Sequence, residues 1–428
     1  MRFSTRWVRV SWLFALMLTM ALAIVACGDD DAEPTATSTA AATGTPTAAA
    51  TAAATATAAP TEPASGSTIT VGAGEPIKVG ISTILTGDLQ ALGIPIAQAA
   101  ELAGVGVEIE GHAIQFERKD DQCSSEGGTS AAQQLIDAGV VGVVGPVCSS
   151  SVIASQPLYE EAGISTISPS STAVASTAPA GREPYPTFFR VTYNDAIQGP
   201  ALAAFASDEL SAGTVYVVFF NDAYGQGLKD EFQAAYTGEV LGSEGFERGA
   251  TDFSSIVTNI ENKAPDAVFF SGFFGEAVPF ITQLREKGLT MPFLSADGVR
   301  DEQFITLAGA AAEGAYLSLP SPTLSGDVYT KFKADYLAAY GKEADTSPFT
   351  AESYDASTAL IAAIEAVAEV SGTSLTIDLA KLRDAIAATD MTGAIGHIQF
   401  DAKGDNAGGE TPVSFFVVED GQFVPYEG

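Results

Sequence analysis

Short apolar runs alternate with segments of helical periodicity from residue 77 to residue 287. The runs at residues 140–144, 214–220 and 267–272 are almost continuously apolar, which is typical of strands buried on both faces of a parallel sheet. We expect strands at residues 77–82, 113–119, 140–144, 164–167, 214–220 and 267–272. We expect helices between them at residues 94–103, 128–138, 152–161, 199–210, 225–236 and 276–287. This order predicts an α/β fold with parallel sheets, arranged as two Rossmann-like lobes.

The chain after residue 328 is mostly helical. Helices are expected at residues 328–340, 350–370 and 379–388, and strands at residues 398–400 and 413–418. These late elements must join one lobe or the other, because they follow the elements of both. The chain is therefore expected to cross between the lobes more than once.

Three consecutive serines, Ser149 to Ser151, stand between the buried run at residues 140–144 and the expected helix at 152–161. The start of a helix presents unpaired backbone N–H groups and the positive end of the helix dipole. Hydroxyl groups added there make a site suited to a carboxylate. The simpler alternative is that the serines only cap the helix. We take residues 145–151 as the point on which other candidate residues are expected to converge.

The N-terminus has the layout of a secretory signal. Three arginines precede an apolar run at residues 10–25, and Cys27 follows almost at once. The end of this run resembles the lipobox of bacterial lipoproteins, which implies a signal peptide of residues 1–26 and a lipidated Cys27. The alternatives are an ordinary signal peptide or a membrane anchor with an accidental cysteine. The sequence turns polar directly after Cys27, which favours the lipoprotein interpretation.

A low-complexity segment follows the signal. From residue 33 to about residue 67 the chain is almost only Ala, Thr, Pro, Ser and Gly. Such a segment has little to bury and is expected to be disordered. We expect residues 27–75 to form a tether that holds an extracytoplasmic body close to the membrane through its lipid anchor.

The chain is strongly acidic, with 53 Asp and Glu against 20 Lys and Arg and a net charge of −33. This balance excludes a nucleic-acid partner for practical purposes. It also argues against a body that lies flat on an anionic membrane. Apart from the N-terminal apolar run, no stretch of the sequence is long enough to span a bilayer.

Cysteine and histidine are scarce. Cys123 and Cys148 each follow an expected strand, and neighbouring strand ends of a parallel sheet bring cysteines within bridging range. A disulfide is favoured in an exported protein. A catalytic Cys148 would need a basic partner, but His112 and His397 both lie outside the strand-end loops. We therefore expect no metal site of His and Cys ligands, no cofactor and no enzyme activity.

In a parallel sheet the carboxyl ends of all strands face one crevice, where ligands bind. In the first lobe, hydroxyl-bearing loops follow the strands at residues 86–93 and 168–173, in addition to the serines. In the second lobe, aromatic residues and acids follow the strands at residues 221–225, 273–276 and 291–298. The two sets of loops are expected to face each other across a cleft.

Together these motifs resemble the type I periplasmic binding proteins of the branched-chain amino acid (Leu/Ile/Val) group, which are the ligand-capturing subunits of ABC importers. The resemblance extends from about residue 77 to near the C-terminus. It rests on the order and spacing of residues 77–80, 120–123, 145–151, 168–173, 198–200, 222–225 and 400–405. With it we predict a first lobe of residues 76–193 and 321–395 and a second lobe of residues 194–320 and 396–428, joined by a multi-crossover hinge.

The resemblance assigns roles to polar residues. Ser149 and Thr172 correspond to the pair that binds the α-carboxylate of the ligand. The carbonyl of Ser170 and the carboxylate of Asp297 correspond to the acceptors of its α-ammonium group. Tyr224 corresponds to the aromatic residue that closes over the ligand from the second lobe. The chemistry agrees, since a helix start suits an anion and a carboxylate suits a cation.

The rest of the predicted binding site is apolar: Leu92, Val147, Cys148 and Phe273. Such a lining favours aliphatic or aromatic amino acids over charged ones. Cys123 and Cys148 match the disulfide of the family. The sequence also departs from the family pattern, because Leu92 and Phe273 stand where tyrosines are usual and Asp297 is one methylene shorter than the usual glutamate.

We therefore expect a monomeric, lipid-anchored solute-binding subunit of an ABC importer, which captures an amino acid and delivers it to a membrane permease. The ligand is expected to be branched-chain or otherwise apolar. The alternative is a sensor or receptor ectodomain for amino acids, amides or small carboxylates, because the same fold serves both functions.

Overall fold

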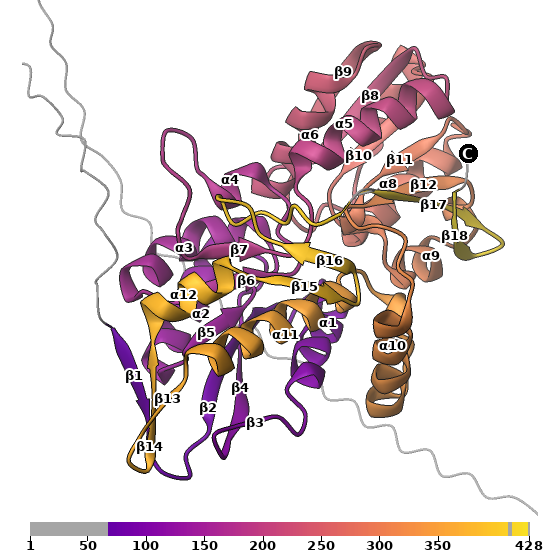
Figure 1. Ribbon diagram of the computed structural model, residues 1–428. Helices are drawn as coiled ribbons and strands as arrows, with labels where there is room; N and C mark the ends of the chain where they lie inside the picture. Colours follow the sequence, from indigo (N-terminus) through magenta and orange to yellow (C-terminus); the bar gives the residue numbers. More distant parts are fainter. Residues whose placement is uncertain (1–66, 410–412, 427–428) are drawn as a thin grey trace, which may run out of the picture. The chain divides into compact units, whose positions relative to one another are not determined.

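Two β-sheets organise the chain in the computed structural model, which describes residues 67–409 and 413–426 (Figure 1). The first sheet has the strand order β3-β4-β2-β5-β6-β7, and the second has the order β18-β17-β12-β11-β10-β8-β9. The predicted signal peptide, the lipidated Cys27 and the tether up to residue 66 lie outside the described residues.

The first sheet is parallel apart from its edge strand β3. Its strands are β3 (Glu108–Ile109), β4 (His112–Asp120), β2 (Ile77–Thr83), β5 (Gly142–Val144), β6 (Ser165–Ser168) and β7 (Phe188–Arg190). The helices that follow in this part of the chain are α1 (Gln90–Ala103), α2 (Ser125–Ala138), α3 (Ser149–Ala162) and α4 (Val174–Thr177). Both α2 and α3 end at a left-handed glycine, Gly139 and Gly163, which satisfies their last carbonyl groups.

The late helices join the first lobe. They are α10 (Asp327–Tyr340), α11 (Thr350–Val367) and α12 (Leu379–Ala387). Helix α11 packs against α1, β5 and β6, and α12 packs against α11 (Figure 1). Leu360 and Ile364 of α11 are fully buried in the same core as Val79 and Val143 of the sheet. One continuous apolar core therefore combines segments that are far apart in the sequence.

The second sheet is parallel from β9 to β12 and ends in two antiparallel strands. Its strands are β8 (Thr214–Phe220), β9 (Glu239–Phe246), β10 (Ala267–Ser271), β11 (Phe293–Ser295), β12 (Ala315–Leu319), β17 (Ser414–Glu419) and β18 (Gln422–Pro425). Its helices are α5 (Asp195–Ala204), α6 (Ala223–Ala235), α7 (Ser254–Lys263), α8 (Phe274–Glu286) and α9 (Glu302–Ala308). Stacked phenylalanines, including Phe246 against Phe270 and Phe270 against Phe280, fill its core.

Three segments, which contain Tyr193, Pro320 and Asn406 in chain order, connect the two lobes and lie against one another. The backbone N–H of Tyr193 donates to the carbonyl of Pro320 (3.3 Å), which joins the first segment to the second. The side chain of Asn406 donates to the carbonyl of Val191 (2.7 Å), which joins the first segment to the third. The chain thus has two Rossmann-like lobes and a multi-crossover hinge.

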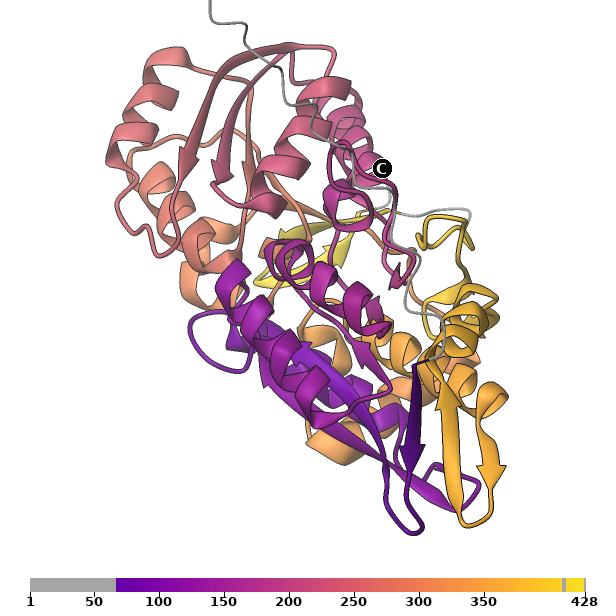
Figure 2. The same ribbon diagram turned by 90° about the vertical axis from the view of Figure 1, so that its left-hand side faces the viewer.

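The structure corrects the predicted tether and one predicted lobe boundary. Residues expected in the tether form β1 (Thr68–Val71), which pairs with β14 (Ser374–Asp378), and β14 pairs with β13 (Glu369–Ser371) (Figure 2). The hairpin of β15 (Asp390–Gly393) and β16 (Gly396–Gln399) buries Ile398 in the core of the first lobe, although residues from 396 onward were assigned to the second. Both errors arise because strand pairing and core packing connect residues that are distant in the sequence.

Several helix boundaries also differ from the prediction. Helix α3 begins at Ser149, so the three serines form its first turn and Cys148 is its N-cap residue. Helix α11 ends at Val367, and Val370 belongs to β13. The helix expected at residues 199–210 is α5 followed by a π-helical turn, Phe205–Glu209. The edge strand β9 was not predicted.

Candidate functional site

The loops at the carboxyl ends of strands from both sheets surround one small cavity. Its lining is Leu92, Val147, Cys148, Ser149, Ser170, Tyr224, Phe273, Asp297, Gly298 and Phe349. Eight of the nine residues proposed from the sequence as ligand contacts are in this lining, and the ninth, Thr172, is fully buried. The cavity measures about 20 Å³, which is room for about one water molecule. An amino acid can enter only if the lobes separate or side chains move.

Ser149 presents a hydrogen-bond donor at the first-lobe end of this cavity. Its Oγ accepts from the backbone N–H of Ala173 (3.2 Å) and from the hydroxyl of Ser171 (3.3 Å). A hydroxyl has two acceptor positions and one proton. Both acceptor positions of Ser149 are used, so its proton is left to be donated. The start of α3 adds backbone N–H groups and the positive end of the helix dipole, so this end of the cavity suits an anion.

The loop after β6 is bonded to the loop after β5. The hydroxyl of Ser170 donates to the carbonyl of Val147 (2.9 Å), and the hydroxyl of Ser168 donates to the carbonyl of Pro146 (2.6 Å). The proton of the Ser170 hydroxyl is therefore used, so this residue can offer a ligand only acceptors, which are its hydroxyl oxygen and its backbone carbonyl. These bonds hold the loops of Ser149 and Thr172 in one arrangement.

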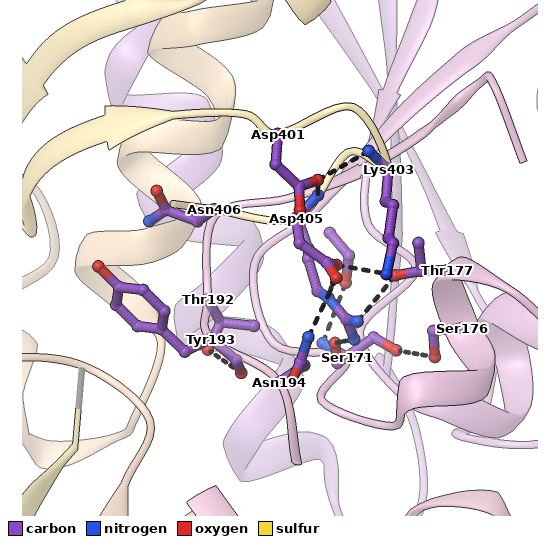
Figure 3. Close-up of polar contacts among 12 residues, drawn as sticks. Ser171, Ser176, Thr177, Thr192, Tyr193, Asn194, Asp401, Lys403, Asp405 and Asn406 are labelled. Atoms are coloured by element: carbon purple, nitrogen blue, oxygen red, sulfur yellow. Dashed lines mark hydrogen bonds and ion pairs between the residues drawn. The ribbon is translucent and has the colours of Figure 1, made fainter. Parts of the chain in front are cut away.

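An ion pair between the buried Arg190 and the partly exposed Asp405 supports the loop of Thr172. Figure 3 shows Asp405 with two of its other partners, Thr177 and Asn194. The guanidinium of Arg190, which is fully buried, donates to the carbonyls of Ser171 (2.9 Å) and Ala173 (2.8 Å), on either side of Thr172. It also pairs with the carboxylate of Asp405 at 2.6 Å. The same carboxylate accepts from Thr177 (2.8 Å) and from the side chain of Asn194 (3.0 Å). The connecting segment that contains Asp405 and Asn406 thus supports the loop of Thr172 in the first lobe.

The second lobe contributes two aromatic rings and a carboxylate. The rings of Tyr224 and Phe273 are tilted against each other with centroids 5.1 Å apart. The hydroxyl of Tyr224 accepts from the backbone N–H of Gly298 (3.2 Å). Burial raises the pKa of Asp297 to about 7, although nearby Gln198 and Tyr224 lower it. A buried carboxyl that titrates near neutrality suits a cationic ligand group.

Asp195 lies behind Thr172 and is fully buried. Its backbone N–H donates to the carbonyl of Thr172 (2.9 Å). Burial raises the pKa of Asp195 well above its ordinary value, and the negative charge of Asp297 raises it further, while the Thr172 hydroxyl and Arg190 lower it. The charge of Asp297 therefore disfavours ionisation of Asp195, although Asp195 is not part of the cavity lining.

Polar contacts join the lobes beside the cavity. The hydroxyl of Ser150 donates to Asp222 (3.1 Å), and the guanidinium of Arg248 donates to the carbonyl of Cys123 (2.8 Å). They border an open hollow of about 480 Å³. These residues were not proposed as contacts between the lobes. Such bonds stabilise a closed arrangement, because each needs groups from both lobes.

Three further residues at or beside the cavity were not predicted from the sequence. Phe349 lines the cavity from the start of α11 in a left-handed conformation (φ 65°), which no local pattern announces. Gly298 is required because a Cβ there would lie 2.5 Å from the carbonyl oxygen of Gly272. Asp195 precedes the Gln198–Gly199 motif and has the acidic chemistry of a candidate, but only the fold places it near Asp297.

Cys123 and Cys148 form a disulfide, with Cα atoms 5.1 Å apart. The bond joins the loops after β4 and β5, so it supports the start of α3. In residues 67–409 and 413–426, no group of three or more His, Cys, Asp or Glu side chains is placed to hold a metal ion. Within the same residues, no helix has both the length and the apolar character needed to cross a membrane.

Comparison with known proteins identifies the family. Residues 76–422 match the family described as periplasmic binding protein. The chain belongs to this family. Among the similar proteins are an amino acid binding protein of Pseudomonas aeruginosa, 32% identical over 72% of this chain and 80% of the relative, and the Leu/Ile/Val-binding protein of Escherichia coli, 27% identical over 78% and 89%.

Solved structures of other periplasmic binding proteins share the two-lobed fold. The leucine binding protein LivK of Thermotoga maritima has a TM-score of 0.74 at 28% identity, over 82% of this chain and 97% of that one. The protein LivJ of Streptococcus pneumoniae, in complex with isoleucine, has a TM-score of 0.72 at 26% identity, over 82% and 100%. The solute binding protein of R. palustris, in complex with benzoate, has a TM-score of 0.70 at 24% identity, over 82% of this chain and 95% of that one, and this similarity shows the fold alone.

Proposed function

We propose that this periplasmic binding protein is the solute-binding subunit of an ABC importer for an apolar α-amino acid, with branched-chain amino acids as the first candidates. The ligand is captured between the two lobes and delivered to a membrane permease. The observation that carries the proposal is the polarity of the small cavity, which has the hydroxyl of Ser149 and the start of α3 in one lobe and the carboxyl of Asp297 in the other.

Each end of the cavity matches one end of a zwitterion. Ser149 and Thr172 bind the α-carboxylate, and the carbonyl of Ser170 and the carboxylate of Asp297 bind the α-ammonium group. Leu92, Val147, Cys148 and Phe273 surround an apolar ligand side chain, and Tyr224 covers the ligand from the second lobe. Capture couples to closure, because the ligand gains its full set of contacts only when both lobes touch it.

The same proposal gives the protein a place in the cell. The signal at residues 1–26 exports the chain, lipidation of Cys27 anchors it, and the low-complexity segment up to residue 66 links the anchor to the folded body. The protein acts as a monomer outside the cytoplasm, and it is a binding protein without enzyme activity. Mass spectrometry of the membrane-extracted protein tests the anchor, since a lipidated N-terminal Cys27 adds the mass of its acyl chains.

A thermal-shift screen tests the ligand class. The purified folded body is heated with each proteinogenic L-amino acid, and with benzoate as a carboxylate that lacks an ammonium group. A ligand at about a hundred times its Kd adds about 2.7 kcal/mol to the free energy of unfolding, so leucine, isoleucine or valine is expected to raise Tm by several degrees. Stabilisation by benzoate without any effect of amino acids would contradict the proposal.

A further inference from the structure

A buried polar cluster lies where the two lobes meet, beside the chain segment that carries Phe349. Arg300 of the second lobe is 9% exposed, and Glu352 of the first lobe is 1% exposed. Within the described residues, Arg300 Nε, Glu352 Oε1 and the hydroxyl oxygens of Ser321 and Ser347 are buried without a hydrogen-bond partner. Burial lowers the pKa of Arg300, while the charge of Glu352 is near enough to raise it. Unpaired buried atoms are costly, so a guanidinium and a carboxyl that each keep one, in opposite lobes, indicate a pair that forms when the lobes move.

Arg300 is fixed in the second lobe, next to Asp297 of the cavity. Its backbone N–H donates to the carbonyl of Asp297 (3.1 Å), which closes the short helical turn that begins at Asp297. Its guanidinium lies over the rings of Phe416 and Phe423, 4.6 Å and 5.3 Å from their centroids. A planar guanidinium that stacks on aromatic rings is restricted in direction. The charge of Arg300 is therefore held at a defined place relative to the carboxyl of Asp297.

The partner of Arg300 in the first lobe is the loop that carries Phe349. One N–H of the guanidinium donates to the backbone carbonyl of Asp345 (3.2 Å). The hydroxyl of Thr350 donates to the carbonyl of Ala344 (2.9 Å), which closes the loop around Phe349. Phe349 in turn lines the cavity. Arg300 therefore connects a ligand-facing loop of the first lobe to the second lobe.

We propose that Arg300 is a positioning residue for ligand capture, which reaches from the second lobe to the Phe349 loop and to Glu352 and so holds Phe349 against the ligand. Arg300 acts through Phe349 and does not touch the ligand itself. Closure of the lobes brings the guanidinium onto the carboxyl of Glu352, and each group then gains the partner that it lacks. The inference rests on the proposed function in one respect, that the ligand occupies the cavity lined by Phe349.

A purely structural role of Arg300 has different consequences. Stacking on Phe416 and Phe423 would stabilise the second lobe alone, so loss of the guanidinium would lower Tm and leave ligand affinity unchanged. In the positioning role, loss of the link raises the fraction of open molecules, and the radius of gyration of the ligand-free protein increases. Ligand affinity then falls in proportion to the remaining fraction of binding-competent protein.

The test compares Arg300→Met, Glu352→Gln and the double variant with the wild type, and includes Arg300→Lys, which keeps the charge. The control is Arg285→Met, because the guanidinium of Arg285 donates to the carbonyls of Leu289 (2.8 Å) and Met291 (3.1 Å), both within the second lobe. Calorimetry measures affinity for the L-amino acid that gives the largest thermal shift, or for benzoate if no amino acid binds. Small-angle X-ray scattering measures the radius of gyration without ligand.

We expect Arg300→Met to weaken binding by about fivefold to a hundredfold and to enlarge the ligand-free protein, with a smaller loss in Arg300→Lys. Arg285→Met is expected to lower Tm and to change neither affinity nor radius. If Arg300 and Glu352 act as a pair, the double variant binds no more weakly than Arg300→Met alone. Should Arg300→Met not fold, weaker binding and a larger radius in Glu352→Gln support the same link.

The contrary results are distinct. Unchanged affinity and radius in Arg300→Met, an equal loss of affinity in Arg285→Met, or losses that multiply in the double variant would each overturn the role of Arg300 and leave the proposed function standing. Wild-type protein that binds benzoate and no amino acid would overturn the proposed function alone, because the same variants are then compared with benzoate.

Discussion

At the residue scale, the bonds that a side chain already makes decide what it can offer a ligand. Ser149 accepts two hydrogen bonds and keeps its proton, whereas Ser170 gives its proton to Val147 and keeps a carbonyl. Asp297 is buried with one unpaired oxygen. These differences separate a donor end from an acceptor end within one small cavity. The same residue type, serine, therefore has two different proposed roles.

Substitution of Ser149 tests whether its hydroxyl donates to the ligand. Ser149→Ala is expected to weaken amino-acid binding by about 1.5–3 kcal/mol, because a hydrogen bond to a charged group is lost. Isothermal titration calorimetry with the amino acid that the screen identifies measures this change. The control is Ser155→Ala on the same helix, which removes a buried hydroxyl bonded only within α3, to Val152 (3.3 Å). Equal affinity losses in the two variants would mean that the effect is on α3 and not on the ligand.

At the element scale, the connecting segment that contains Asp405 supports the loop of Thr172 through the buried charge of Arg190. Arg190 is fully buried, and its guanidinium bonds to Asp405 and to the carbonyls on both sides of Thr172. Removing Arg190 takes the cation from Asp405, whose side chain is 17% exposed, and leaves two buried carbonyls of the Thr172 loop without their donor. By contrast, Arg182 and Glu160 form an ion pair in which the arginine side chain is 42% exposed. Exposed pairs contribute little to stability because water screens them.

The two arginines form a matched pair for mutation. Arg190→Met is expected to lower the free energy of unfolding by about 3–5 kcal/mol, whereas Arg182→Met is expected to lower it by about 0–1 kcal/mol. Urea denaturation followed by circular dichroism measures both. Ligand affinity is also expected to fall in Arg190→Met, because the Thr172 loop loses its support. A change of under about 1 kcal/mol in Arg190→Met would show that the ion pair is not needed to hold the loop.

At the scale of the whole molecule, buried carboxyls make stability depend on pH. Burial raises the pKa of Asp121 to about 6 and the pKa values of Asp297 and Asp355 to about 7. In the unfolded chain these groups titrate near 4. Between these values the folded protein binds more protons than the unfolded chain. The contribution of these three carboxyls to the free energy of unfolding is fully present below about pH 4. It is lost as the pH rises through their folded-state pKa values.

We therefore expect the unliganded protein to be less stable at about pH 8 than at about pH 5, with a slope of up to about 1.4 kcal/mol per pH unit for each such carboxyl. Urea denaturation at a series of pH values measures the slope. Asp297→Asn removes one titrating group and is expected to flatten the slope, while the exposed Asp208→Asn leaves it unchanged. Stability that rises with pH in this window would contradict the assignment of buried, protonated carboxyls.

The affinity for an amino acid is expected to rise with pH, whereas the stability of the unliganded protein is expected to fall. The carboxyl of Asp297 must be ionised to pair with an ammonium group, and its pKa near 7 means that binding at lower pH requires loss of a proton. The ligand is thus expected to bind more tightly as the pH rises from about 5 to about 8. The form that is most stable without ligand is therefore not the form that binds best.

Local sequence was sufficient where local physics decides the structure. The runs that became β2, β5, β8 and β10 are mostly apolar and mostly buried, so their position and the α/β order could be predicted. The edge strand β9 was missed because its sequence is mixed in polarity and contains two glycines, as suits a strand that is largely exposed. The family and the grouping of Ser149, Tyr224 and Asp297 around one cavity also followed from motif order; their contacts with a ligand remain predictions.

Only the tertiary structure could decide the rest. The pairing of β1 with β14, the left-handed Phe349 in the cavity, and the approach of Asp195 to Asp297 all depend on residues far apart in the chain. Arg190 and Asp405 are 215 residues apart in the sequence, yet together they support the Thr172 loop. Hydrophobic periodicity acts over neighbouring residues and so determines where strands and helices form. Burial and charge interactions act through space between residues that are distant in the sequence. Only the folded arrangement of the two lobes shows which residues they connect.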